Sequence, residues 1–250
     1  MNNRTVNPSL RLSATLLLVG QLLYIVVTQF HAGGEANDHP AIFTVYAGNG
    51  IWTAVHLAQF GGMALLLAGL LALFFALDVQ AGAARWAGRF GAASAVAALA
   101  LYGALQAVDG VANKQADMAW VNAPAAEKAA RFASAEAIRW IEWGLRSYQN
   151  YVLGLAVLLF AVALVRAARV PRPIAYLMGL CGLTYVVQGW VVGIEGFSQT
   201  LSIAIVLAWV LGLAWMIWLA VVARRMQDAE PGLLANDGAG RPEAILTSAR

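Results

Sequence analysis

Six long apolar blocks run through the chain, and they restrict its fold more than any other feature. A helix that crosses about 30 Å of hydrocarbon needs about 20 apolar residues at 1.5 Å per residue. The blocks predict spans at about 12–30, 51–77, 86–108, 147–166, 174–194 and 197–223. We therefore expect an all-α, polytopic membrane protein whose six transmembrane helices form one bundle.

The composition supports a lipid environment and excludes several classes of function. Only 12% of the 250 residues are charged, about half the share found in soluble domains. The single cysteine, Cys181, lies inside an apolar block, so one chain can form neither a disulfide nor a Cys-based metal site. The basic residues are scattered rather than clustered, and we expect no nucleic-acid partner. The chain also lacks a Gly-rich phosphate loop, a His-Glu-x-x-His motif and a Gly-x-Ser-x-Gly motif.

The distribution of basic residues predicts the orientation of the bundle. The even-numbered connections between blocks are rich in Arg, whereas the first and last odd-numbered connections contain no Lys or Arg. Because Lys and Arg concentrate in cytoplasmic loops, we expect both termini in the cytoplasm and a multi-pass protein of a bacterial-type inner (plasma) membrane. Residues 1–225 are expected to form a single domain with a polar exterior connection at 109–146, followed by a flexible cytoplasmic tail at 226–250.

A stripe of alternating charge lies where the polar connection enters the fourth block. Glu136, Arg139, Glu142 and Arg146 are spaced three, three and four residues apart, so a helix places them on one face. Such a stripe is either a set of solvated ion pairs, each contributing little to stability, or the mouth of a polar site.

Polar residues on the other spans are also weighted toward the predicted exterior halves. Intramembrane polar groups usually face a partner or a water-filled cavity, so this pattern predicts a polar vestibule closed below by apolar packing. The alternative is that helix ends are polar wherever they meet water. The candidate ligand-binding residues are His56, Gln59, Gln106, Asp109, Arg139, Glu142, Arg146, Gln149, Gln188 and Glu195.

His56 is the candidate with the clearest chemistry, because its charge changes near neutral pH. A buried His that only satisfies its own hydrogen bonds is the simplest interpretation. If the residue is functional, Glu142 is the carboxylate we expect beside it, with Asp109 and Glu195 as competitors. His56 and Glu142 are then the catalytic candidates for proton transfer.

The histidines of the first connection form a possible metal site. His31, Glu35 and His39 are evenly spaced, and with His56 they would offer three imidazoles and a carboxylate to zinc or copper. Glycines and a proline between them argue against a continuous helix. We therefore expect a polar hairpin there, with no metal and no cofactor.

Three functions remain open from the sequence. The first is binding or passage of a small amphipathic ligand through the exterior-facing pocket. The second is an accessory role in a membrane complex or a homo-oligomer, in which small-residue faces and the Trp-rich sixth span contact a partner. The third is an intramembrane enzyme that performs acid-base chemistry on a lipid-like substrate.

Overall fold

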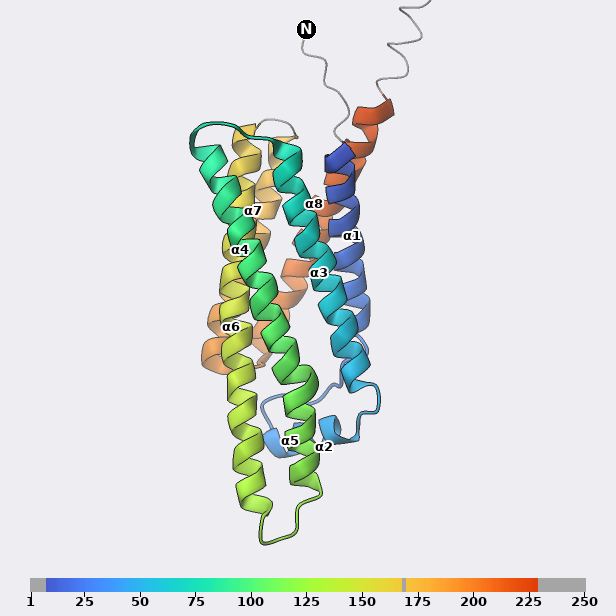
Figure 1. The fold of residues 1–250 in the computed structure, drawn as a ribbon, viewed down its shortest axis with the longest axis vertical. Helices are drawn as coiled ribbons and strands as arrows, with labels where there is room; N and C mark the ends of the chain where they lie inside the picture. Colours follow the sequence, from blue (N-terminus) through green and yellow to red (C-terminus); the bar gives the residue numbers. More distant parts are fainter. Residues whose placement is uncertain (1–7, 168–169, 229–250) are drawn as a thin grey trace, which may run out of the picture.

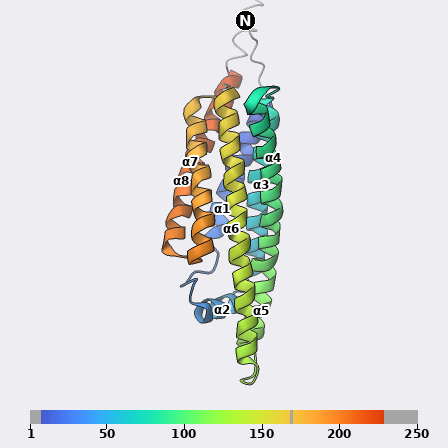
Figure 2. The ribbon, with the colours of Figure 1, turned by 90° about the vertical axis from the view of Figure 1, so that its left-hand side faces the viewer.

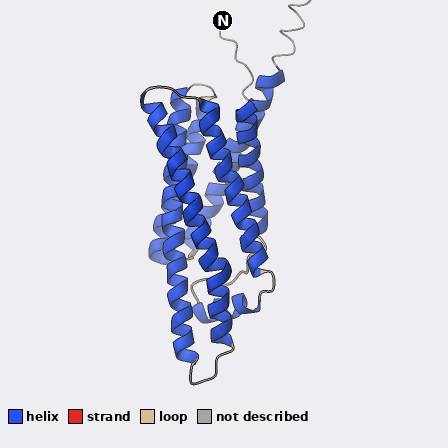
Figure 3. Cartoon of the chain, in the orientation of Figure 1, coloured by secondary structure: helices blue, strands red, loops and turns tan. Residues whose placement is uncertain are grey.

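The computed structural model describes residues 8–167 and 170–228, and within these ranges the chain forms helices without any strand (Figure 3). The elements are α1 (Pro8–Thr28), α2 (His39–Gly48), α3 (Trp52–Leu77), α4 (Gly82–Ala107), the π-helix η1 (Val108–Asn113), α5 (Lys114–Val121), α6 (Lys128–Ala167), α7 (Arg172–Glu195) and α8 (Gln199–Asp228). Six helical segments in this part of the chain are long and apolar enough to cross a membrane.

The long helices form a closed ring. Their contacts follow the cyclic order α1, α3, α4, α6, α7 and α8, which returns to α1. Figure 1 places the start of α1 and the end of α8 at the same end of the bundle. We call the opposite end, which carries α2 and α5, the distal end; α4 and α6 extend furthest in that direction (Figures 1 and 2).

The region expected to be a polar connection, 109–146, is largely helical. The third long segment continues through η1 and α5 to Val121, and α6 begins at Lys128. Only residues 122–127 interrupt the two helices, where the sequence Asn-Ala-Pro interrupts the helical pattern. The region contains no other proline that would interrupt a helix. The third long segment and α6 therefore both extend beyond the expected spans. Helix α8 likewise continues to Asp228, and the rest of the expected tail lies outside the described residues.

Close backbone contact between α1 and α3 aligns the polar residues at their distal ends. A Cβ atom on Gly20 would lie 2.5 Å from the backbone nitrogen of Leu66, so only glycine fits there. About two helical turns before Gly20, the Ser13 hydroxyl donates a hydrogen bond of 2.9 Å to the carbonyl of Gly69. Small residues of this kind let membrane helices approach closely.

The bundle interior is apolar near the termini and polar near the distal end. Leu17, Leu67, Leu70, Leu73 and Phe160 are fully buried in the apolar half. Most of the buried charged and amide side chains lie in the distal half. This division of the interior determines where a polar site can exist.

Helix α2 covers part of the distal end. The carboxylate of Asp38 accepts a hydrogen bond from the Ala41 amide and caps the start of the helix. At its other end, the Lys114 ammonium of α5 donates to the carbonyls of Tyr46, Ala47 and Asn49 at 2.7 to 2.8 Å. A cation is favourable at a helix C-terminus, and here it fixes α2 to the bundle.

Candidate functional site

A charged cavity with a volume of about 260 Å³ lies at the distal end. We call it the distal cavity. It is lined by residues of α1, α2, α3, α4, η1, α6, α8 and the connection between α1 and α2. Six of the sequence-predicted site residues line it: Gln59, Gln106, Asp109, Arg139, Glu142 and Arg146. The predicted convergence of polar residues from separate helices is therefore present in the structure.

The π-helix η1 supplies Asp109 and Asn113 to this region. A π-turn contains an extra residue, which re-aims the side chains that follow it, and such turns are frequent at functional sites. Gly110 in the same turn lies against the ring of His56: a Cβ atom there would be 2.7 Å from the His56 Cβ. The absence of a side chain at Gly110 allows η1 to bring Asp109 against α3.

His56 contacts Asp109, and this corrects the expected pairing with Glu142. The His56 Nδ1 atom is 2.8 Å from the carbonyl oxygen of Trp52, and its Nε2 atom is 3.1 Å from Oδ2 of Asp109. The Trp52 indole donates a 2.9 Å hydrogen bond to the backbone carbonyl of Asp109. Asp109 was the named competitor, and η1 places it closer to His56 than the sequence could indicate.

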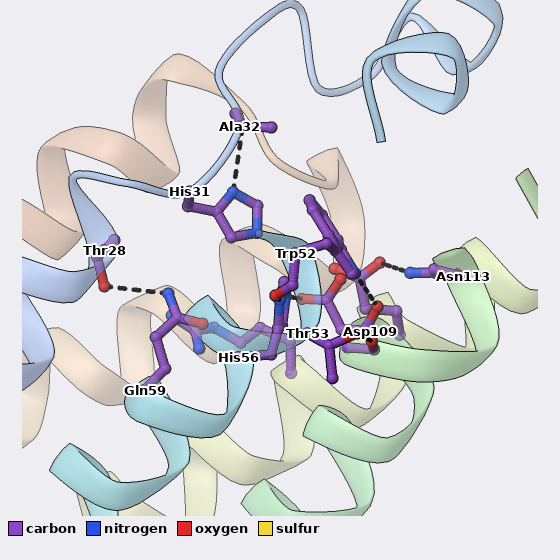
Figure 4. A network of polar contacts seen from close by, with 12 residues as sticks. Thr28, His31, Ala32, Trp52, Thr53, His56, Gln59, Asp109 and Asn113 are labelled. Carbon is purple, nitrogen blue, oxygen red and sulfur yellow. Dashed lines mark hydrogen bonds and ion pairs between the residues drawn. The ribbon is translucent and has the colours of Figure 1, made fainter. Parts of the chain in front are cut away.

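His31 completes this cluster from the segment that follows α1 (Figure 4). Its ring centroid lies 5.1 Å from that of His56 and 4.9 Å from that of Trp52. Its Nδ1 atom is 3.1 Å from the carbonyl oxygen of Ala32. Burial lowers the pKa of His31 more than the nearby Asp109 carboxylate raises it, which favours the neutral imidazole.

Arg139 and Glu142 form a buried ion pair rather than a solvated one. The Arg139 Nη1 atom lies 2.6 Å from Oε2 of Glu142, and both side chains are almost fully buried. The same carboxylate oxygen accepts a 2.6 Å hydrogen bond from the Asn113 amide. Arg139 also donates to the carbonyl of Ala36 at 3.1 Å and stacks on the ring of Phe197 at 4.6 Å. The pair therefore joins α6, η1 and the segment before α2.

Arg146 differs from Arg139 because it has no carboxylate partner within the described residues. Its Nη2 atom donates a 3.2 Å hydrogen bond to the Tyr24 hydroxyl, and its buried Nε atom has no hydrogen-bond partner. The side chain lines the distal cavity. A guanidinium with an unused donor at a cavity wall is able to bind a carboxylate or a phosphate group.

Comparison with protein families, curated proteins and solved structures finds no match to this chain. The functional assignment therefore depends on the geometry of the site. That geometry offers an anion-binding group, Arg146, and a neighbouring cluster that contains His31, His56 and Asp109.

Three predicted site residues lie elsewhere. The Gln188 amide donates to the carbonyl of Ala204 between α7 and α8. Glu195 is exposed at the end of α7, where its carboxylate accepts from the Ser198 hydroxyl. Gln149 is fully buried, and neither the oxygen nor the nitrogen of its amide has a hydrogen-bond partner in the part of the chain that the structure describes, but it does not line the distal cavity.

The side chains of His31, Glu35 and His39 do not lie together in the structure. His39 packs at the start of α2, where its Nδ1 atom is 2.9 Å from Oε1 of Glu136. Glu35 is exposed on the connecting segment. Only His31 turns toward His56 and Asp109.

Asn113 and Asp117 were not predicted as site residues, because they fall in the segment expected to be a polar connection. Asp117 of α5 is fully buried, and neither of its carboxylate oxygens has a hydrogen-bond partner within residues 8–167 and 170–228. A signal was present: Asp109, Asn113 and Asp117 recur every four residues. That spacing is typical of one helix face.

A larger groove with a volume of about 590 Å³ lies between α6 and α7 near the termini. Its lining is almost entirely aliphatic, with Leu158, Val162, Gly179 and Leu183 among its residues. A groove this apolar offers few polar partners to a ligand, so we do not include it in the site.

Proposed function

We propose that this chain is a multi-pass membrane protein whose distal cavity binds the anionic head group of a small amphipathic molecule. The observation that carries the proposal is Arg146, a cavity-lining guanidinium whose side-chain hydrogen-bond partner, among the residues that the structure describes, is the Tyr24 hydroxyl alone. A partly buried cation without a counter-ion has lost part of its hydration, and an anionic ligand would supply the missing charge. In the adjacent pair, Glu142 already neutralises Arg139.

The shape of the cavity fits a small head group better than a large ligand. Its volume of about 260 Å³ lies just below the range of about 300–1,000 Å³ typical of drug-sized ligands. The side chains of Leu105, Phe197 and Ile205 add apolar contact area to the same wall. An amphiphile would place its anionic group against Arg146 and its first methylene groups against these side chains.

We further propose that the distal end faces the exterior and that both termini lie in the cytoplasm of a bacterial-type inner membrane. Arg11, Arg85, Arg89, Arg166 and Arg224 all lie at or near the helix ends opposite the distal cavity. Their concentration at one end supports this orientation by the positive-inside rule. The cavity would then receive its ligand from outside the cell or from the outer leaflet.

The test is ligand-induced stabilisation of the full chain in lipid nanodiscs. We expect decyl phosphate or decanoate to raise the unfolding temperature of the wild type, with a stabilisation of about 2–3 kcal/mol near a hundredfold excess over Kd. Decyltrimethylammonium should not stabilise the protein. Arg146→Gln should lose the response, and Arg146→Lys should keep part of it.

Arg131→Gln is the matched control, because Arg131 is an exposed arginine of the same helix that pairs with Glu127. This variant should respond to the anionic amphiphiles as the wild type does. Equal stabilisation of the wild type and Arg146→Gln would refute the proposal. Equal stabilisation by the cationic and anionic amphiphiles would refute it too.

A second candidate function, an intramembrane enzyme acting on a lipid-like substrate, is favoured by the contact between His56 and Asp109. In this reaction His56 would exchange a proton with the substrate, and Asp109 would orient the imidazole. Incubation of the protein with a native lipid extract, followed by mass spectrometry, would test it. New products that form with the wild type and not with His56→Gln would favour the enzyme.

A further inference from the structure

Three potential metal ligands converge beside the distal cavity. They are His31 from the segment after α1, His56 from α3 and Asp109 from η1, and one ligand atom from each lies within 4.8 Å of the other two (Figure 4). Ligand atoms around a tetrahedral Zn²⁺ are about 3.3–3.5 Å apart, given bonds of about 2.0–2.2 Å. Binding of a metal ion would therefore require side-chain rotations that bring these atoms closer together.

In both imidazoles the hydrogen bond to the backbone is made by Nδ1, which leaves Nε2 available to bind a metal ion. In each ring Nδ1 lies close to a backbone carbonyl oxygen, of Ala32 for His31 and of Trp52 for His56. A carbonyl oxygen only accepts, so both Nδ1 atoms carry a hydrogen and both neutral rings have their lone pair on Nε2. Metal-binding histidines usually have this arrangement, because the second hydrogen bond orients the ring and increases its basicity.

The contact between His56 and Asp109 needs a positive charge. The Nε2 and Oδ2 atoms are 3.1 Å apart, but their geometry is poor for a hydrogen bond, and the second carboxylate oxygen is buried without a hydrogen-bond partner among the described residues. A nitrogen lone pair and a carboxylate oxygen repel each other at this distance. Either a proton on His56 or a cation held by both groups would remove the repulsion, and His31 gives the cation a third ligand.

We propose that His31, His56 and Asp109 bind a divalent first-row transition metal ion, with Zn²⁺ as the reference ion, at the wall of the distal cavity. Two imidazoles and one carboxylate match the borderline ligand preference of this group of ions. Sites with three protein ligands keep a fourth position for water or another ligand. His31 and Asp109 line the cavity, so a metal held between them would border it.

This site goes beyond the proposed anion binding, because it requires no amphiphile and does not use Arg146. The two proposals can therefore fail separately. The competing description is a simple ion pair in which His56 carries a proton and His31 only stacks on its neighbours. That description predicts no metal binding above the level of a variant without the cluster.

The experiment is metal titration of the full-length protein after treatment with a chelator. We expect one Zn²⁺ per wild-type chain by calorimetry, and one Co²⁺ with the visible absorption of a four-coordinate site. Mg²⁺ should not compete, because it prefers an octahedron of oxygen ligands. Asp109→Asn, His31→Gln and His56→Gln should each weaken Zn²⁺ binding by about 100-fold or more.

His39→Gln is the control, because the chain has three histidines and only His39 lies outside the cluster. It should bind Zn²⁺ as the wild type does. Circular dichroism and gel filtration would show which variants fold; if His56→Gln does not, the nearly isosteric Asp109→Asn and the half-buried His31→Gln decide the result. Wild-type affinity in these two variants, or no Zn²⁺ bound by the wild type, would overturn the proposal.

Discussion

Gly110 lies directly against His56, and a Cβ atom at position 110 would be 2.7 Å from the Cβ of the histidine. This contact brings η1 to α3 and places Asp109 at the His56 ring. The two helices can approach this closely because Gly110 has no side chain.

We expect Gly110→Ala to push η1 away from α3 and to lower the free energy of unfolding by about 1–3 kcal/mol. Thermal or denaturant unfolding in a mild detergent would measure this. Gly144→Ala is the control: Gly144 is also in a helix, but a Cβ there would meet nothing within 4 Å. That substitution should stabilise the protein by about 0.5–1 kcal/mol, and similar effects of the two alanines would contradict the packing argument.

The buried pair of Arg139 and Glu142 should be sensitive to the loss of one partner. Arg139→Met leaves the Glu142 carboxylate buried without its cation, and we expect a loss of about 3–5 kcal/mol in unfolding free energy. The double variant Arg139→Met/Glu142→Leu should recover most of this loss, since no uncompensated charge remains.

The exposed pair of Arg131 and Glu127 gives the comparison for this prediction. Both side chains are 53% exposed, so Arg131→Met should change the unfolding free energy by no more than about 0.5 kcal/mol. If the substitutions at positions 131 and 139 had the same effect, the pair at Arg139 would have to be solvated, as one of the sequence interpretations suggested.

Lys114 should control the stability of α2 more than that of the whole bundle. Lys114→Met keeps the aliphatic stem and removes the ammonium that donates to three carbonyls at the end of α2. We expect hydrogen exchange of residues 39–50 to become faster, with a loss of about 1.5–3 kcal/mol in local opening free energy. Lys128→Met removes a donor to the Val121 carbonyl and a cation above the Trp120 ring but no donor to α2, so it should leave the exchange of residues 46–50 unchanged.

The orientation is testable with single cysteines introduced after Cys181→Ala. Ser134 is exposed on the distal part of α6, and Gln80 is exposed in the connection between α3 and α4. In intact cells, a membrane-impermeant maleimide should label Ser134→Cys and not Gln80→Cys. The reverse pattern would invert the proposed topology.

The sequence was informative about single helices and less so about their contacts. It predicted the polar face of α6, and Arg139, Glu142 and Arg146 do line one cavity. It did not separate their roles: Arg139 is neutralised by Glu142, whereas Arg146 has the Tyr24 hydroxyl as its one side-chain hydrogen-bond partner in the described part of the chain. Tyr24 is 122 positions away in the chain, and no spacing rule within one helix relates residues so far apart.

The partner of His56 shows the same limit. Glu142 and Asp109 were both plausible from their positions along predicted helices. The π-turn at η1 and the missing side chain of Gly110 decided in favour of Asp109. The predicted span ended at about residue 108, so the helical turn that carries Gly110 to His56 was not expected from the sequence.

The amino-acid sequence by itself determined that the chain forms six long apolar helices and that their polar residues are weighted toward one end. Those properties follow from length, periodicity and charge within single segments. The tertiary structure alone decided which polar groups meet, because the contacts of His31, His56 and Asp109 depend on the rotation and axial position of separate segments. Helical periodicity assigns a side chain to a face, and only packing against neighbouring helices places that face within bonding distance of another.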